Sequence, residues 1–481
     1  IWVKLLPLLK FVLTNATVIE NLVAVAKDAA LQHGVLMRIQ EAPNSSEVRS
    51  NNTFTNNFFP LYVSSLYNQA LSLQKHFNTL VDRISQDSEF LKEALARYTI
   101  EVDDFTSRLF KIHQQVLEEG RSSSITMGLN RSDYMMDQRD DGPVLKQIEI
   151  NTIAASFGGL STHTPEVHRK TLHLVGRFKE SQRILDNNVA AGLAGGLAKA
   201  WELYGSEKAV VMFLVEDKQR NIFDQRCVEY ELWKRNVPTT RKRFDVVYKT
   251  GSLDQDKKLF VDGLEVAVVY FRNGYMPDQY VSEQSWETRL MMERSKAVKC
   301  PDISTHLTGT KKVQQVLAKP GVVERFFPEQ PEVAQQIRAT FAGLYTLDQG
   351  PEGDKAEAMA LAEPERFVLK PQREGGGGNN IYGKDIVEVL QGLKGSTGRM
   401  AYILMDKIQP VPSKNYLLRR DNPVKMSNCL SELGVYGAYV RHGKDMVMNQ
   451  CVGHLLRTKS NEDTDGGVAA GVAVLDNPVL F

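Results

Sequence analysis

Four consecutive glycines lie in the stretch FVLKPQREGGGGNNIYG, residues 367–383. An apolar run typical of a strand leads into Lys370, and Glu374 directly precedes the glycines. Because glycine has no Cβ, such a loop can turn its N–H groups toward a ligand. The lysine supplies a cation for phosphate, and the carboxylate supplies an oxygen for Mg²⁺. The stretch therefore predicts a triphosphate site, with a flexible surface hairpin as the alternative.

Neither of the two common phosphate-loop patterns fits this stretch. Residues 378–384 match GxxxxGK, but Asp385 follows where the pattern needs a hydroxyl group for Mg²⁺. The third glycine of GxGxxG is also missing. We therefore expect the loop to join two strands. Asp385 is expected to cap a helix over residues 386–393, with Glu388 completing a capping box.

The composition is that of a soluble globular protein. The chain has 481 residues and a net charge of +1, which favours two or more domains and argues against nucleic-acid binding. We interpret the basic cluster Arg241, Lys242 and Arg243 as a solvated surface. The four cysteines have no metal-ligand spacing, which predicts neither disulfides nor zinc and favours the cytosol. Residues 5–12 are expected to form an amphipathic helix, with a targeting segment as the alternative, and no run is long enough to span a membrane.

Hydrophobic periodicity predicts a mixed α/β protein. Helical spacing of apolar residues covers 21–32, 64–84, 88–98, 103–119 and 184–204. Buried strand-like runs at 209–216 and 264–271 flank a helix at 222–235, as in a parallel sheet. We expect a helical scaffold and the first part of the core at 1–205, an α/β substrate-binding subdomain at 206–310, and the rest of the core at 311–481.

Polar side chains follow both buried strands. Gln219, Asn221 and Gln225 follow the first, and Arg272 and Tyr275 follow the second. Because ligands gather at the carboxyl ends of parallel strands, this edge of the sheet is a candidate substrate site.

The segment QIEIN, residues 147–151, alternates polar and apolar side chains. In a strand, Glu149 and Asn151 would share one face, and their oxygens suit an octahedral cation. The alternative is the wet face of an amphipathic strand. Arg131, upstream, is a candidate partner for a substrate carboxylate.

The C-terminal third adds further candidates. Residues 401–408 are a strand whose backbone could read an adenine edge, and Glu432 is placed to accept from a ribose hydroxyl. Arg457 and Lys459 share one strand face. The small residues that follow Asp465 are typical of a mobile lid.

These segments resemble the eukaryotic-type glutathione synthetases, a family of homodimeric ATP-grasp ligases. The likeness extends from about residue 20 to the C-terminus. The strings that carry it, in chain order, are QIEINTIAASFGGL, NIFDQ, FRNGYMP, VKCPDI, GTKKVQQ, KPQREGGGGNN, SELGVYG, HLLRTK and DGGVAAGVAVLDNP.

The resemblance implies an ATP-grasp fold and a cytoplasmic homodimer. It implies ATP- and Mg²⁺-dependent ligation of γ-glutamylcysteine and glycine to glutathione through an acyl phosphate, with release of ADP and phosphate. One alternative is a related carboxylate-amine ligase that uses another amine, such as β-alanine or serine. The other is a catalytically silent nucleotide-binding subunit.

The resemblance also implies roles for individual residues. The catalytic residues would be Arg131, Lys370 and Arg457, and Mg²⁺ would be held by Glu149, Asn151 and Glu374. Substrate would be bound by Arg131, Ile153, Ala154, Ala155, Ser156, Gln219, Arg220, Asn221, Gln225, Arg272, Asn273, Gly274, Tyr275, Arg457, Val468 and Ala469. ATP would be bound by Glu149, Lys311, Lys370, Gly375, Gly376, Gly377, Gly378, Asn379, Asn380, Tyr382, Met405, Asp406, Lys407, Ile408, Glu432, Lys459 and Asp465.

The chain departs from the family pattern at three places. Gln219 stands where the family has glutamate, which removes a charge that could face the substrate amino group. The glycine loop is one residue longer, and about fifteen residues at the start do not match.

Overall fold

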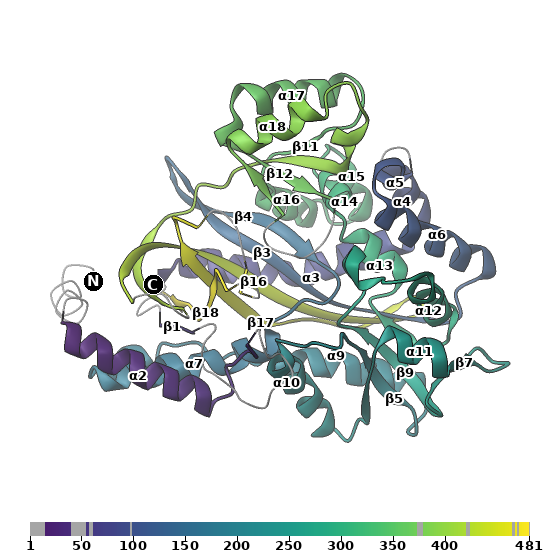
Figure 1. Ribbon diagram of the computed structural model, residues 1–481, viewed down its shortest axis with the longest axis horizontal. Coiled ribbons are helices and arrows are strands. Elements are labelled where there is room, and N and C mark those ends of the chain that lie inside the picture. The colour runs from purple at the N-terminus through teal and green to yellow at the C-terminus, as the bar shows by residue number, and fades with distance from the viewer. Residues whose placement is uncertain are drawn as a thin grey trace.

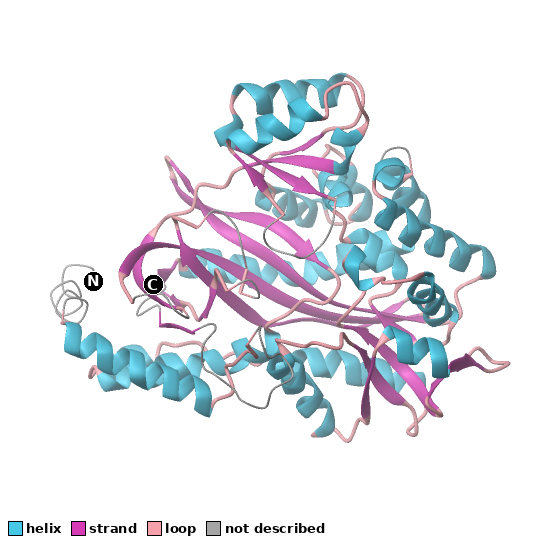
Figure 2. Ribbon diagram, in the orientation of Figure 1, coloured by secondary structure: helices cyan, strands magenta, loops and turns pink. Residues whose placement is uncertain are grey.

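The structure is a computed structural model, shown in Figures 1 and 2. It describes residues 15–39, 54–56, 61–96, 99–372, 379–419, 424–463, 467–468 and 471–480. The helix expected over residues 5–12 lies outside these ranges. Among the described residues, no helix is both long and apolar enough to cross a lipid bilayer.

A large antiparallel sheet forms the centre of the molecule (Figure 2). β16 pairs with β15, β17 and β3, and β3 also pairs with β4, so the sheet joins segments far apart in the chain. Its strands are β1 (Phe54–Asn56), β3 (Ile125–Arg139), β4 (Gly142–Asn151), β15 (Ser413–Leu418), β16 (Met426–His442), β17 (Asp445–Ser460) and β18 (Val474–Asp476).

Helices cover both faces of this sheet. α3 (Ser64–Gln86) contributes to the core on the face of Val435 and Tyr439, and α9 (Val189–Tyr204) to the core on the face of Tyr436 and Ala438. The other helices of this part are α2 (Ala16–Gln32), α4 (Ser88–Leu95), α5 (Thr99–Val102), α6 (Asp104–Glu119), α7 (Gly158–Leu174) and α8 (Phe178–Ser181). The predicted scaffold helices are thus confirmed, although α9 begins five residues later than expected.

A mixed sheet lies beside the large one, at the lower right of Figure 1. β5, β6, β9 and β10 are mutually parallel, as the buried runs predict, whereas β7 and β8 are antiparallel additions. The strands are β5 (Val210–Leu214), β6 (Thr239–Lys242), β7 (Gly251–Leu253), β8 (Leu259–Val261), β9 (Leu264–Phe271) and β10 (Val298–Cys300). The helices are α10 (Ile222–Trp233), α11 (Phe244–Thr250), η1 (Pro277–Gln279) and α12 (Glu283–Arg294).

A small antiparallel sheet stands above the large sheet in Figure 1, and α17 and α18 pack on it. Its strands run in the order β11-β14-β12-β13, so the segment after β12 connects two antiparallel strands, as predicted. The elements are β11 (Leu344–Thr346), α17 (Pro351–Ala362), η2 (Pro364–Arg366), β12 (Phe367–Pro371), β13 (Ile381–Tyr382), α18 (Lys384–Gly392), η3 (Gly398–Ala401) and β14 (Tyr402–Asp406).

The predicted capping box at α18 is wrong. The helix begins at Lys384, and its N-cap is Gly383, which has a φ of 54° and gives no side-chain cap. Asp385 therefore lies inside the first turn instead of before it. Glycine reaches this left-handed backbone without steric cost, so the turn forms at Gly383.

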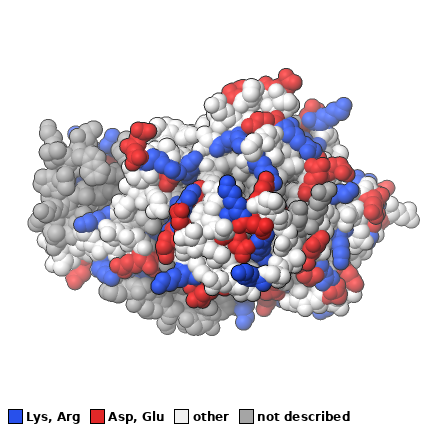
Figure 3. Space-filling view, turned by 90° about the horizontal axis from the view of Figure 1, so that it is seen from above, with Lys and Arg blue, Asp and Glu red and all other residues white. Residues whose placement is uncertain are grey.

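Short elements complete the chain. They are α13 (Ile303–Thr308), α14 (Lys311–Leu317), α15 (Val322–Phe326), α16 (Pro331–Thr340), and the paired strands β2 (Leu61–Tyr62) and β19 (Val479–Leu480). All four cysteines are free. On the face shown in Figure 3, basic and acidic side chains are interspersed. The domain boundaries at 205 and 310 stay a prediction.

Candidate active site

The predicted metal strand, β4, lies against two of the predicted phosphate lysines. Lys311 Nζ, at the start of α14, is 2.9 Å from Glu149 Oε2. Lys370 Nζ, near the end of β12, donates a hydrogen bond of 3.0 Å to the carbonyl of Ile148. Burial alone would raise the pKa of Glu149, but Lys311 and Lys370 outweigh it and hold that pKa below its ordinary value. The carboxylate therefore stays ionised where it could meet a cation.

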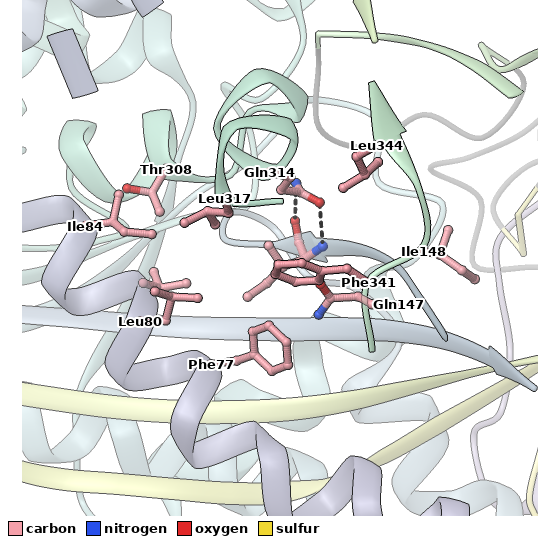
Figure 4. Close-up of a pocket in the computed structure, with 12 residues that line it drawn as sticks. Phe77, Leu80, Ile84, Gln147, Ile148, Thr308, Gln314, Leu317, Phe341 and Leu344 are labelled. Atoms are coloured by element: carbon pink, nitrogen blue, oxygen red, sulfur yellow. Dashed lines mark hydrogen bonds between the residues drawn. The ribbon is translucent and has the colours of Figure 1, made fainter. Parts of the chain in front are cut away.

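Gln314 fixes α14 to β4, as Figure 4 shows. Its Oε1 accepts from the Ile150 N–H at 3.1 Å, and its Nε2 donates to the Ile150 carbonyl at 3.3 Å. The amide thus pairs with both backbone groups of the residue next to Glu149. This contact sets the position of Lys311, one turn earlier on α14. The motif GTKKVQQ contains Gln314, but it carries no signal that this glutamine has such a partner.

A buried carboxylate, Asp133, joins the arginines of the large sheet. Arg131 reaches its two oxygens at 2.6 and 2.8 Å, and Arg457 lies 2.9 Å from Oδ2. Arg457 also pairs with Glu432, directly opposite on β16. Burial raises the pKa of Glu432, and Arg457 opposes that rise. Glu432, predicted to accept from a ribose, is therefore engaged with an arginine in this structure.

The segment after β4 forms a tight loop around Ser156. Arg272 donates to Ser156 Oγ at 2.6 Å, and Arg131 donates to the Ser156 carbonyl at 3.1 Å. Ala154 and Phe157 have φ values of 50° and 75°, which non-glycine residues rarely adopt. The loop therefore needs external support to keep this conformation.

Asp224, on α10, provides part of that support. Its carboxylate accepts from the N–H groups of Phe157 at 2.8 Å, Gly159 at 2.7 Å and Leu160 at 3.3 Å. Asp224 thus caps α7 from another helix. It replaces the cap that the N-cap residue Phe157 does not give with its own side chain. The motif NIFDQ contains Asp224, but it carries no signal that this carboxylate caps another helix.

The polar residues that follow β5 come together in one hydrogen-bonded group. Gln225 Nε2 donates to Asn221 Oδ1 at 3.1 Å and also to Gln219. Gln225 Oε1 accepts from Arg241 Nη2 at 2.6 Å, and Arg241 pairs with Glu229. The interpretation of Arg241 as solvated surface is therefore wrong, because this arginine turns inward from the end of β6.

The predicted adenine segment, residues 401–408, contains β14 of the small sheet. Tyr345 donates to Asp406 Oδ2 at 3.1 Å, and Lys407 Nζ lies 6.0 Å above the ring of Tyr382. Met405 is buried in the same strand. The predicted nucleotide residues on β12, β13 and β14 thus share one sheet.

Several predicted residues lie outside the described part of the chain, and their placement stays a prediction. Of the remaining predicted residues, the structure describes Ile153, Ala155, Arg220, Asn273, Gly274, Tyr275, Asn379, Asn380, Ile408, Lys459 and Val468. It does not describe Glu374, Gly375, Gly376, Gly377, Gly378, Asp465 and Ala469. Within the described ranges no group of three or more His, Cys, Asp or Glu side chains could hold a metal.

The small antiparallel sheet, together with a large sheet that carries acidic and basic side chains, defines an ATP-grasp type of α/β protein. Residues 16–480 match the family model described as eukaryotic glutathione synthase, ATP binding domain. The chain therefore belongs to the eukaryotic glutathione synthase family.

Individual relatives agree with this assignment. Glutathione synthetase from Macaca fascicularis is 58% identical over 97% of this chain and 98% of its own. The Homo sapiens protein is 58% identical over 96% of each chain. Chloroplastic glutathione synthetase from Solanum lycopersicum is 46% identical over 87% of this chain and 76% of its own. A glutathione synthetase like-effector from Globodera pallida shares the fold, with a TM-score of 0.77 at 24% identity over 97% and 98% of the two chains.

Proposed function

We propose that this chain ligates γ-glutamylcysteine and glycine to glutathione, with cleavage of ATP to ADP and phosphate through an acyl phosphate. This is the reaction of a ligase that forms a C–N bond, and family membership supports it. The observation that carries the proposal is the meeting of Glu149, Lys311 and Lys370 at one point on β4. Three segments far apart in the sequence supply the charges that phosphoryl transfer requires.

Glu149, Asn151 and Glu374 are proposed to hold Mg²⁺. The donor set fits, because the nitrogen of Asn151 points to Asp133 at 2.9 Å and its oxygen faces away from that carboxylate. When bound, Mg²⁺ would neutralise charge on the ATP phosphates. Lys311, Lys370 and Lys459 are proposed to hold the phosphates themselves.

The dipeptide is proposed to bind around Ser156. Arg131 and Arg272 both reach this loop, so its polar groups and the guanidinium groups lie within one small region. The cysteinyl carboxylate would be oriented there by positive charge and by backbone groups. The γ-glutamyl end would lie near Asn221 and Gln225, with Gln219 giving a neutral partner to its amino group.

Phosphate release tests the reaction. We expect the full-length protein to release phosphate from ATP only when γ-glutamylcysteine and glycine are both present, with glutathione formed in equal amount. Turnover with β-alanine or serine in place of glycine would instead indicate another carboxylate-amine ligase. Nucleotide binding without turnover would indicate a silent subunit.

The assembly and location are further parts of the proposal. Family likeness supports a homodimer. Light scattering of the purified protein should then give a molar mass of twice the 54.1 kDa of one chain. Four free cysteines suit a reducing compartment and support the cytosol. The plant relatives are named as chloroplastic, so microscopy of a tagged full-length chain is the relevant measurement.

A further inference from the structure

We propose that Asp133 is a positioning residue that couples the metal ligand Asn151 to the substrate arginines Arg131 and Arg457. This inference rests on the proposed function, because it assumes the roles given there to these three residues. Asp133 itself would touch neither metal nor substrate.

The carboxylate of Asp133 is the centre of the buried contacts on this face of the large sheet. Its side chain is fully buried. Oδ1 accepts from Arg131 Nε at 2.6 Å, while Oδ2 accepts from Arg131 Nη2 at 2.8 Å, Arg457 Nη2 at 2.9 Å and Asn151 Nδ2 at 2.9 Å. One side chain on β3 therefore holds groups from β3, β4 and β17.

Strand register explains why these groups meet. Arg131 and Asp133 are two residues apart on β3, so their side chains share a face. On the neighbouring strand β4, Asn151 is the register partner of Arg131. On the other side, Asp133 pairs with Gly434 of β16. A Cβ at Gly434 would lie 2.8 Å from both Arg131 Cδ and Asp133 Oδ1. The glycine therefore leaves the space that the arginine and the carboxylate occupy.

The chemistry of the carboxylate determines how Asn151 is oriented. An ionised carboxylate can only accept hydrogen bonds, so the Asn151 amide must turn its nitrogen toward Asp133. The amide oxygen is then the atom available to a cation. The same carboxylate compensates two guanidinium charges that would otherwise be buried close together. Loss of Asp133 should therefore weaken metal binding and dipeptide binding together.

The test compares Asp133→Asn with Asp82→Asn in the full-length protein. Asp82 on α3 is a matched control. Like Asp133, it is a buried carboxylate that accepts from an arginine, here Arg441 Nε at 3.0 Å, but it lies away from the site. Calorimetric titration gives the Kd of γ-glutamylcysteine, and electron paramagnetic resonance gives the Kd of Mn²⁺ with ADP. We expect both Kd values to rise about tenfold or more in Asp133→Asn and to stay within about twofold in Asp82→Asn.

Equal effects in the two variants, or unchanged Kd values in Asp133→Asn, would overturn the inference. Gly434→Ala is the second variant if Asp133→Asn does not fold. Its added methyl group displaces Arg131 and Asp133 without removing a charge, so both Kd values should rise by about threefold or more. Unchanged values there overturn the inference as well.

The wild-type protein separates this inference from the proposed function. Both readouts are binding measurements, so they remain valid if the wild type binds the dipeptide but forms no glutathione. In that case the proposed function fails and the inference is still decided by the Kd values. If the wild type does not bind the dipeptide, both fail.

Discussion

Arg272 holds the loop around Ser156 through two different nitrogens. Nη1 donates to the Ala155 carbonyl at 3.2 Å, and Nη2 donates to Ser156 Oγ at 2.6 Å. Lysine keeps the charge but cannot make both contacts in a planar fork. We expect Arg272→Lys to raise the KM for γ-glutamylcysteine about tenfold, with kcat changed less, in steady-state kinetics. Arg325→Lys, in an exposed ion pair with Asp87, is the control. A change in the KM for ATP alone would assign Arg272 to the nucleotide instead.

A sequence pattern identifies a residue when its side chain differs from what the local strand or helix pattern requires. Glu149 and Asn151 stand out because strand alternation puts two oxygen ligands on one face. Asp133, Asp224 and Arg241 do not stand out, because each acts on a partner that is distant in the chain or sits in an ordinary charged string. Three consecutive basic residues give no indication that the first one turns inward.

At the scale of elements, the Gln314 amide is the clearest determinant of how α14 sits on β4. Gln314→Leu keeps the volume but leaves the Ile150 N–H and carbonyl without this partner. We expect the free energy of unfolding to fall by about 2–4 kcal/mol, measured by urea denaturation. We also expect slower turnover, because Lys311 loses its fixed position beside Glu149.

The control for that prediction is Gln391→Leu, at an exposed position of α18, which should leave both quantities nearly unchanged. If Gln314→Leu behaves like this control, the paired hydrogen bonds of Gln314 contribute nothing measurable to the site.

Periodicity predicted most helices and buried strands, since the burial of one face leaves a repeating pattern. It predicted the first residues of α3, α4, α10 and β9, but not those of α9 and α18. α9 starts at Val189 and α18 at Lys384 because local turn geometry, including the positive φ of Gly383, decides those points. At Gly192 of α9 an added Cβ would lie 2.3 Å from Val452 Cβ, so the lack of a side chain there lets α9 pack closely against β17.

At the scale of the whole molecule, the large sheet could not be derived from local pattern. Its strands come from residues 54–56, 125–151 and 413–476, and pairing over such distances leaves no short-range signal. Family resemblance implied the ATP-grasp fold, whereas periodicity alone predicted only a mixed α/β protein.

The buried polar network around His454 connects the C-terminal segment to the scaffold. His454 Nδ1 is 2.9 Å from Tyr67 Oη, and Nε2 is 2.8 Å from Asn477 Oδ1. Burial lowers the pKa of His454 to about 4, and the Asn477 contact opposes that shift slightly. The imidazole is therefore neutral in the folded protein at pH values where the unfolded chain already binds a proton.

This difference makes stability depend on pH with a definite sign. Above about pH 6.5, the ordinary His pKa, the folded and unfolded states bind the same number of protons at this site. Between about pH 6.5 and 4 only the unfolded state is protonated, so stability falls as the pH falls. We expect His454 to account for a loss of about 2 kcal/mol between pH 7 and pH 5. Urea denaturation at both pH values should show that loss of stability in the wild type. The control His173→Gln, which replaces an exposed histidine, should show the same loss, and His454→Gln a smaller loss. Equal losses in all three proteins would show that His454 is not held neutral by burial.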